Sequence, residues 1–362
     1  ALPSIMTAFD IKDYSTVQWL ATGYMLVSGV LVPTSAYLIT KFRTRPLFIL
    51  SMAIFVIGTA LASFAPSFEF LLAGRMIQAA GAATMAPILM NVMLISFPVE
   101  KRGQAMGMFG LVMVLAPAIG PTLSGWIVEH YDWSVLFKMI LPIAVLSLLL
   151  AVWKLEDVLP NRDAKIDILS IVLSTIGFGG LLYGFSTASS AGWSAIEVWG
   201  TIAAGAIGLA WFIVRQFNLD QPLLDLRIYT YPSYAMASVV SMVLSVAMFS
   251  GMILTPAYVQ SVRGIEPFEA GLMMLPGAIV MGIMSPITGK LFDRFGPRIL
   301  AVIGLTITTL ATVGLGYLDI DSSYLYIISV YTIRMFGISM VMMPIMTNGL
   351  NALPNRLNPH GT

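Results

Sequence analysis

The sequence predicts an all-α integral membrane protein, folded as a bundle of transmembrane helices. Of its 362 residues, 58% are hydrophobic and only 10% are charged, whereas charged residues make up about 25% of soluble domains. The mean hydropathy is +0.87. Apolar segments long enough to cross a bilayer, which takes about 20 residues, recur along the whole chain. The strict apolar–polar alternation of a transmembrane β-barrel is absent, so the spans are expected to be helices.

Eleven apolar segments are bounded by charged or Pro/Gly-rich turns, and each is predicted to be one transmembrane helix. In order along the chain they are 17–40, 46–65, 68–97, 103–129, 133–153, 167–188, 196–214, 233–260, 268–290, 297–317 and 322–350.

The loops between these segments differ in charge. Of the basic loop residues, only Lys12 and Arg263 lie in one set of alternate loops, which holds many acidic residues. The other set carries Lys41, Arg43, Arg45, Lys101, Arg102, Lys154, Arg162, Lys165, Arg215, Arg227, Lys290, Arg294, Arg298 and Arg356. Because basic loops stay in the cytoplasm, the sequence predicts a multi-pass protein of the cytoplasmic membrane, with Ala1 outside and the end at Thr362 inside.

Two of the basic turns are copies of each other. The residues Pro33, Ala36, Leu38, Lys41, Phe42, Arg45 and Leu47 recur as Pro286, Gly289, Leu291, Arg294, Phe295, Arg298 and Leu300. Repeated halves are typical of secondary transporters, whose substrate site lies between the halves near the middle of the membrane. We therefore expect an N-terminal half at 1–153, two inserted helices with their linkers at 154–230, and a C-terminal half at 231–362.

The segment 103–129 contains an unusual run of proline and glycine, APAIGPTLSG at 116–125. Pro117 and Pro121 each remove a backbone donor, which predicts a bent helix whose freed carbonyls are satisfied by its neighbours. Small residues and prolines share one face of this helix, and such a face lets another helix approach closely. The face consists of Gly103, Gly107, Gly110, Val114, Pro117, Pro121 and Gly125, and Gly120 lies within the same run.

Several motifs resemble those of the major facilitator superfamily. The run from Gly289 to Arg298, GKLFDRFGPR, resembles its loop signature, and RMIQAAG at 75–81 resembles its fourth-helix signature. The Pro/Gly run resembles the antiporter signature of its fifth helix. The runs 221–227, 269–276 and 352–355 are similar to the 14-helix drug:proton antiporter branch. The resemblance implies two six-helix halves with two extra helices between them. It also implies a chain incomplete at both ends, without most of the first helix and without the last two.

The resemblance also implies functional residues. Arg75 would act in proton coupling, with Gln78 in the same network, although an arginine there can also serve only packing. The loop residues Gly289, Asp293, Arg294, Gly296 and Arg298 would form a conformational latch, unless their charges only fix the topology. In the first copy of the loop, Thr40 and Arg43 replace the aspartate and glycine of the family. No acidic residue lies near the middle of a span, so the titrating carboxylate is expected in the missing first helix.

A substrate cavity is predicted to include Trp19, Tyr24, Asn91, Arg334 and Met343. Methionine is flexible and polarizable, which suits a pocket that accepts several shapes. Most of the 24 methionines are nevertheless expected to pack against lipid or other helices. Arg334 lies inside the last span, where it serves either the cavity or helix packing.

Enzymatic function is not expected. The chain has no cysteine, its two histidines lie in loops, and it lacks a Gly-x-x-x-x-Gly-Lys phosphate loop, so neither a metal, a cofactor nor ATP is predicted. A net charge of +1 argues against nucleic-acid binding.

The predicted function is proton-coupled efflux of amphipathic, cationic or lipophilic drugs. It is driven by the proton gradient, in a monomer with possible accessory proteins. Two alternatives stay open: an exporter of a lipid, siderophore or cell-wall metabolite, and a sensor or scaffold without transport.

Overall fold

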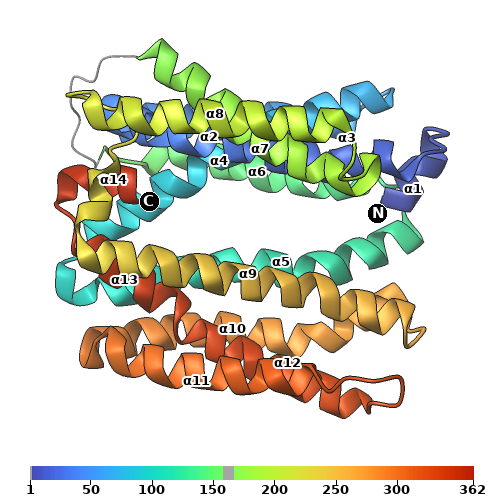
Figure 1. Ribbon diagram of the computed structural model, residues 1–362. Coiled ribbons are helices and arrows are strands. Elements are labelled where there is room, and N and C mark those ends of the chain that lie inside the picture. The colour runs from blue at the N-terminus through green and yellow to red at the C-terminus, as the bar shows by residue number, and fades with distance from the viewer. Residues whose placement is uncertain (1, 158–166) are drawn as a thin grey trace. The chain divides into compact units, whose positions relative to one another are not determined.

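A computed structural model describes residues 2–157 and 167–362, and the regular structure of these residues is helical (Figure 1). The helices are α1 Leu2–Ala8, α2 Tyr14–Lys41, α3 Thr44–Ser63, α4 Phe68–Ser96, α5 Arg102–His130, α6 Val135–Lys154, α7 Ile168–Ala191, α8 Ile196–Asn218, α9 Pro232–Ser261, α10 Pro267–Phe295, α11 Pro297–Leu315, α12 Tyr324–Ser339, α13 Met342–Asn351 and α14 Asn358–Gly361. Three short 3₁₀ helices, Val99–Lys101, Leu226–Thr230 and Asn355–Leu357, complete the described elements.

The prediction of eleven spans is confirmed. Among the described residues, eleven helical segments are long and apolar enough to cross a membrane, and their bounds follow the predicted ones within a few residues. The last span differs in form, because it is broken between α12 and α13 at Met340 and Val341. Pro344 explains the break, since it offers no N–H to the carbonyl of Met340 four residues earlier.

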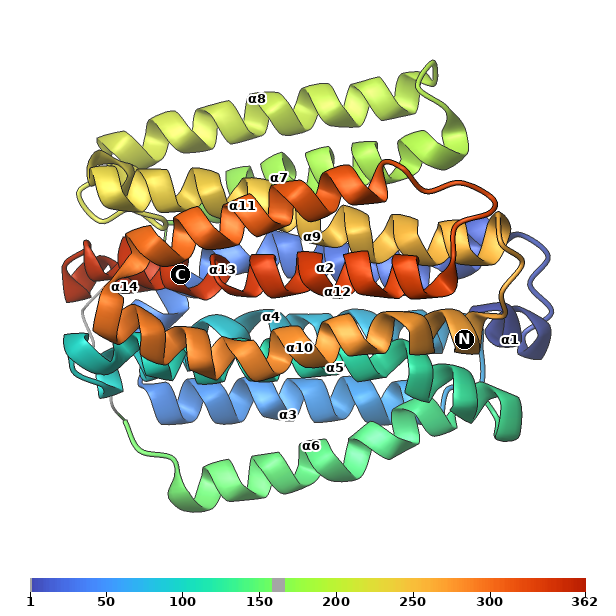
Figure 2. The same cartoon turned by 90° about the horizontal axis from the view of Figure 1, so that it is seen from below.

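The helices form two compact units. The first consists of 1–92, 130–228 and 355–362, and therefore contains α1–α3, α4 as far as Val92, α6–α8 and α14. Within it α3 packs along α6, α7 packs along α8, and α2 packs on α7; α7 and α8 run side by side in Figures 1 and 2. Two apolar clusters hold this unit together. One centres on Ile5, Val17, Leu20, Leu71, Trp133 and Phe137, and the other on Tyr37, Leu173, Phe212 and Leu223.

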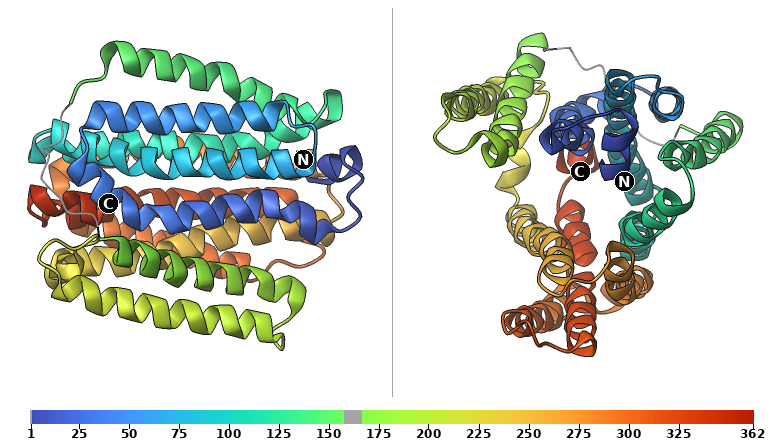
Figure 3. Two further views of the ribbon diagram at one scale, coloured as in Figure 1. Left: turned by 90° about the horizontal axis from the view of Figure 1, so that it is seen from above. Right: turned by 90° about the vertical axis from the view of Figure 1, so that its right-hand side faces the viewer.

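The second unit consists of 93–129 and 229–354, and therefore contains α5 and α9–α13. Here α12 packs against both α10 and α11, and α13 packs against α9; α10, α11 and α12 are neighbours in Figure 2. Within each unit the long helices run along a common direction (Figure 3). The contacts thus group α5 with the later helices, while the division into halves at 153 and 231 stays a prediction from the repeated loops.

Candidate functional site

Arg75, on α4, makes three interactions within the first unit, and two of them are with α2. Its Nε donates to the carbonyl oxygen of Leu20 at 3.2 Å, and its Nη1 donates to Oε1 of Gln78 at 3.2 Å. The guanidinium also lies over the ring of Tyr24, 4.1 Å from the ring centroid, a cation–π arrangement. The charge is therefore held in a fixed place by neutral groups.

Gln78 extends this network to a third helix. Its side chain is only 1% exposed, and its Nε2 donates to Oγ1 of Thr59 on α3 at 2.8 Å. The Thr59 hydroxyl donates in turn to the carbonyl of Phe55 at 2.8 Å. Close backbone packing makes this reach possible, because a Cβ atom at Gly74 would lie 2.8 Å from the backbone nitrogen of Ala62. The structure thus brings Arg75 and Gln78 together, as predicted.

No carboxylate pairs with Arg75 among the described residues, whose two ion pairs are Arg43–Asp157 and Arg215–Asp167. A fixed positive charge of this kind favours the ionised form of any carboxyl group that approaches it.

Asp293, near the end of α10, holds the start of α5. Its Oδ1 accepts a hydrogen bond from the backbone N–H of Gly103 at 2.9 Å, and its Oδ2 accepts one from Gln104 at 2.9 Å. These N–H groups belong to the first turn of α5, where the helix has no internal acceptors for them and where a negative charge is favourable. The carboxylate of the predicted latch thus binds a helix end.

The other latch residues shape the turn after Asp293. Gly296 ends α10 with a φ of 79°, in the region that favours glycine. Gly289 approaches the Gly103 carbonyl so closely that a Cβ atom would overlap it. Arg294 and Arg298 are exposed, and the two ion pairs of the described residues involve neither of them.

The first copy of this loop has a different structure. Thr40, at the position of the family's aspartate, donates its hydroxyl to the Ala36 carbonyl of its own helix at 2.8 Å. Arg45 instead holds the end of α6, because its Nη2 donates to the Val152 carbonyl at 2.6 Å. The first copy carries no carboxylate of its own, and the backbone N–H of Arg45 in the first turn of α3 is instead bound by Oδ1 of Asp157 at 2.9 Å.

The close approach predicted for α5 stays a prediction at Gly120 and Gly125. A Cβ atom at either glycine would meet no described atom within 4 Å. Close packing lies at the other end of the helix, where a Cβ at Gly107 would overlap the Ser285 carbonyl of α10. Gly103 and Gly107 thus face α10 at helical spacing, whereas in the Pro/Gly run it is Thr122 that approaches α10, with its Oγ1 3.1 Å from the place of a Cβ at Gly271. Pro117 is part of the continuous helix α5; the side chain of Pro121 lies outside the described residues.

The predicted cavity residues fall into both units. In the first unit, Trp19 stacks on Tyr183 with ring centroids 5.6 Å apart, and Tyr24 lies under Arg75. Asn91, fully buried, donates to the Pro87 carbonyl at 2.8 Å and to the Thr362 hydroxyl at 2.6 Å.

Arg334 and Met343 belong to the second unit. The Cγ atom of Met343 lies 2.9 Å from the position that a Cβ atom would take at Gly110. A single cavity shared by residues of both units stays a prediction.

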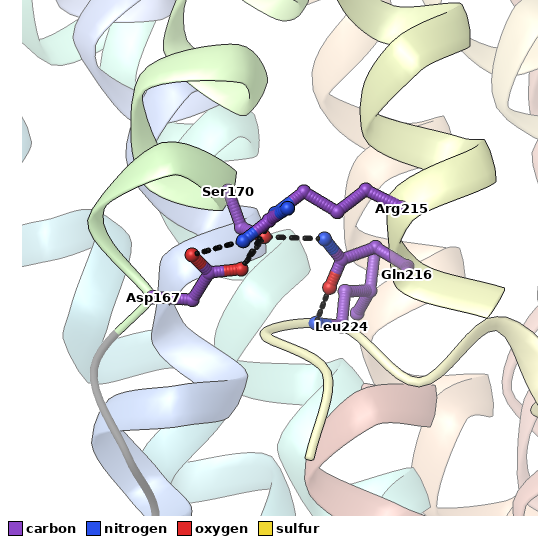
Figure 4. Close-up of polar contacts among 5 residues, drawn as sticks. All are labelled: Asp167, Ser170, Arg215, Gln216 and Leu224. Atoms are coloured by element: carbon purple, nitrogen blue, oxygen red, sulfur yellow. Dashed lines mark hydrogen bonds and ion pairs between the residues drawn. The ribbon is translucent and has the colours of Figure 1, made fainter. Parts of the chain in front are cut away.

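A polar cluster that the sequence reasoning missed joins the ends of the two inserted helices (Figure 4). Asp167 precedes α7 and accepts from Nε of Arg215 at 2.9 Å and from its Nη2 at 3.0 Å. Gln216 donates to Ser170 at 2.7 Å and accepts from the backbone N–H of Leu224 at 3.2 Å. Hydrogen bonding from Arg215 lowers the pKa of Asp167. The sequence did hold a signal for this pair, because the acidic Asp167 stands directly before one span and the basic Arg215 stands in the last turn of the next.

Comparison with known sequences identifies relatives over the whole chain. The profile of the Major Facilitator Superfamily matches residues 1–362. An uncharacterized MFS-type transporter of Bacillus subtilis, YhcA, is 47% identical over 100% of this chain and 68% of its own length. The lincomycin resistance protein LmrB of Listeria monocytogenes is 43% identical over 100% of this chain and 77% of its own. The multidrug resistance protein Stp of Mycobacterium tuberculosis is 27% identical over 98% and 66%.

Solved structures share the fold at low identity. The proton:xylose symporter XylE superimposes with a TM-score of 0.63 at 15% identity, covering 99% of this chain and 78% of that one. The human organic anion transporter MFSD10 gives a TM-score of 0.65 at 14% identity, covering 99% and 79%. These likenesses concern the fold alone. With its helical spans, its repeated loops and a family match along its full length, the chain belongs to the major facilitator superfamily of membrane transporters.

Proposed function

We propose that this protein exports amphipathic drug-like molecules across the cytoplasmic membrane in exchange for protons. Relatives named for lincomycin resistance and multidrug resistance support the cargo class. The basic loops face the cytoplasm in this proposal, following the positive-inside rule. Lincomycin is therefore the first cargo to test, followed by lipophilic cations.

Proton coupling rests on one observation, the guanidinium of Arg75 held inside a membrane span by neutral groups alone. A charged side chain in this place is costly and typically functional. When a protonated carboxyl group comes near Arg75, the positive charge favours loss of its proton. When the two separate, the carboxyl group regains a proton. Alternation between these states would couple proton entry to substrate exit.

The capped helix end provides the conformational step. In one state Asp293 binds the first turn of α5, and in the other this contact is released. Because the contact consists of hydrogen bonds to a charged group, it stabilises one state without locking it.

Transport into proteoliposomes containing the full-length protein tests the proposal. An imposed pH gradient is expected to drive uptake of radiolabelled lincomycin or of a fluorescent cation, and collapse of the gradient with nigericin is expected to stop it. Arg75→Gln should lose gradient-driven flux. Lys138→Gln is the matched control, because Lys138 is an exposed base within a span and its Nζ lies 5.4 Å from the centroid of the Phe64 ring. Flux that is unchanged when the gradient is collapsed, or gradient-driven flux that is retained in Arg75→Gln, contradicts the proposed coupling. A folded protein with no flux of any cargo favours the sensor or scaffold alternative.

A further inference from the structure

The second buried arginine, Arg334 on α12, differs from Arg75 in having an unused donor. Its side chain is 3% exposed. Nε donates to the Thr312 hydroxyl of α11 at 3.1 Å, and Nη2 donates to the Ala247 carbonyl of α9. Nη1 is buried and has no hydrogen-bond partner among the described residues. A buried guanidinium nitrogen without a partner costs free energy, because it has lost its water without replacement.

The charge of Arg334 is also uncompensated. Both acceptors are neutral groups, and the two ion pairs of the described residues lie elsewhere. No aromatic ring lies over its guanidinium among the described cation–π contacts, in contrast to Arg75. A buried positive charge is expensive unless a negative charge accompanies it, and inside a membrane span this expense typically marks function.

The unused nitrogen points at bare backbone. A Cβ atom at Gly251 of α9 would overlap Nη1, so no side chain from this position covers that end of the guanidinium. The acceptor nearby is already shared, because the Ser250 hydroxyl also donates to the Ala247 carbonyl at 3.1 Å. Nη1 therefore lacks an acceptor. Because the charge of Arg334 is also uncompensated, an acceptor with a negative charge would satisfy both needs.

Neighbours of Arg334 and Ala247 in the chain belong to an apolar cluster of polarizable side chains. Met335 follows Arg334 in the chain and Met248 follows Ala247, and both belong to one apolar cluster with Met281 and Tyr331. Thioethers adapt their shape and are polarizable. This setting suits a weakly hydrated anion, or a carboxylate attached to an apolar body, better than a strongly hydrated ion.

We propose that Arg334 is the binding residue of an anion site between α9, α11 and α12. Its ligand is a monovalent anion, which is either a free inorganic ion or the carboxylate of a transported amphipathic molecule. The existence of the site is independent of the proposed transport, and only the second source of the ligand rests on it. Binding of the anion is favourable because Nη1 gains a charged acceptor, and charged hydrogen bonds are roughly twice as strong as neutral ones.

Equilibrium binding of radiolabelled thiocyanate to the full-length protein in detergent tests this site without any gradient. Saturable binding is expected in the wild type, with affinity lower by about tenfold or more in Arg334→Gln, since a factor of ten is only about 1.4 kcal/mol. Gly251→Ala keeps the charge but displaces Nη1, so it should weaken binding too. Lys154→Gln, which removes an exposed base at the end of α6, should bind as the wild type does.

Competition identifies the source of the anion. Displacement of thiocyanate by benzoate at lower concentration than by chloride indicates a carboxylate on an apolar body, whereas the reverse order indicates an inorganic ion. The proposal is overturned if the folded wild type shows no saturable binding, or if Arg334→Gln and Gly251→Ala both bind thiocyanate as tightly as the wild type. A failure of proton-driven transport leaves these binding results unaffected, so the two proposals fail separately.

Discussion

Asp293 caps α5 by accepting a hydrogen bond from the backbone N–H of Gly103 at 2.9 Å. The two residues are 190 positions apart in the chain, yet together they join the repeated loop to the helix with the proline–glycine run. The second carboxylate oxygen binds the next amide, that of Gln104. Within this charged motif, Asp293 thus binds the N-terminus of another helix.

Removal of this cap should destabilise the second unit and alter transport. Asp293→Ala leaves two amides of α5 unsatisfied, and loss of an N-terminal cap costs about 0.5–2 kcal/mol. We expect a lower Tm in detergent and a slower transport cycle. Glu266→Ala is the control, because Glu266 stands at the start of α10 without a side-chain cap hydrogen bond. Equal Tm and flux in Asp293→Ala and the wild type would remove the latch from the mechanism.

The two ends of α5 should respond in opposite ways to a methyl group. Gly103→Ala places Cβ 2.6 Å from Oδ1 of Asp293, so α5 must move away from α10 and Tm should fall. Gly120→Ala meets open space and should leave Tm unchanged or raise it slightly, since alanine favours helix by up to about 1 kcal/mol over glycine. Thermal unfolding of the two variants side by side measures this. A larger loss in Gly120→Ala would show that the Pro/Gly run is the tight contact after all.

The Asp167–Arg215 pair should make stability depend on acidic pH. The pKa of Asp167 is lowered in the folded protein by hydrogen bonds from Arg215, so the unfolded chain takes up its proton first as pH falls. The stabilisation is fully present above the ordinary carboxyl pKa of about 3.9 and disappears as pH falls through the lower, folded value. Asp167→Asn should therefore lower Tm at pH 7, and the difference from the wild type should shrink at the acid end of that window.

Asp157→Asn is the matched control for this pH series. Asp157 pairs with Arg43 at 3.8 Å through a side chain that is 37% exposed, and exposed pairs contribute little. Its Oδ1 also accepts the backbone N–H of Arg45 at 2.9 Å, a bond that the amide oxygen of asparagine can keep. The Tm of Asp157→Asn should follow that of the wild type throughout. A constant difference between Asp167→Asn and the wild type at every pH would mean that the ionisation of Asp167 does not contribute.

A charge added beside Arg75 should interfere with coupling. Gln78→Glu replaces the neutral acceptor of Nη1 with a carboxylate, which would pair permanently with the guanidinium. We expect the folded protein to bind cargo with wild-type affinity while gradient-driven flux falls by about tenfold or more, because each factor of ten needs only about 1.4 kcal/mol. Gln18→Glu adds the same charge at an exposed position on α2 and should transport normally. Unchanged flux in Gln78→Glu would contradict a coupling role for Arg75.

The sequence by itself determined the class of this protein, its eleven spans and the placement of Arg75 inside one of them. These properties are local, because the transfer of an apolar segment into lipid depends on its own length and composition. The break before α13 was not predicted, because prolines such as Pro33 and Pro87 also lie inside unbroken helices. The resemblance to the major facilitator superfamily, carried by short motifs, was equally a property of the sequence.

Only the tertiary structure decided the partners. It placed Thr59 beside Gln78, the first turn of α5 beside Asp293, and Arg215 beside Asp167. It also showed that Gly103 and Gly107 of the predicted face of α5 lie against α10, and it left a donor of Arg334 unused. Hydropathy is an average over a whole span, so it cannot say which faces meet. That choice follows from the shapes and hydrogen-bonding groups of helices far apart in the chain.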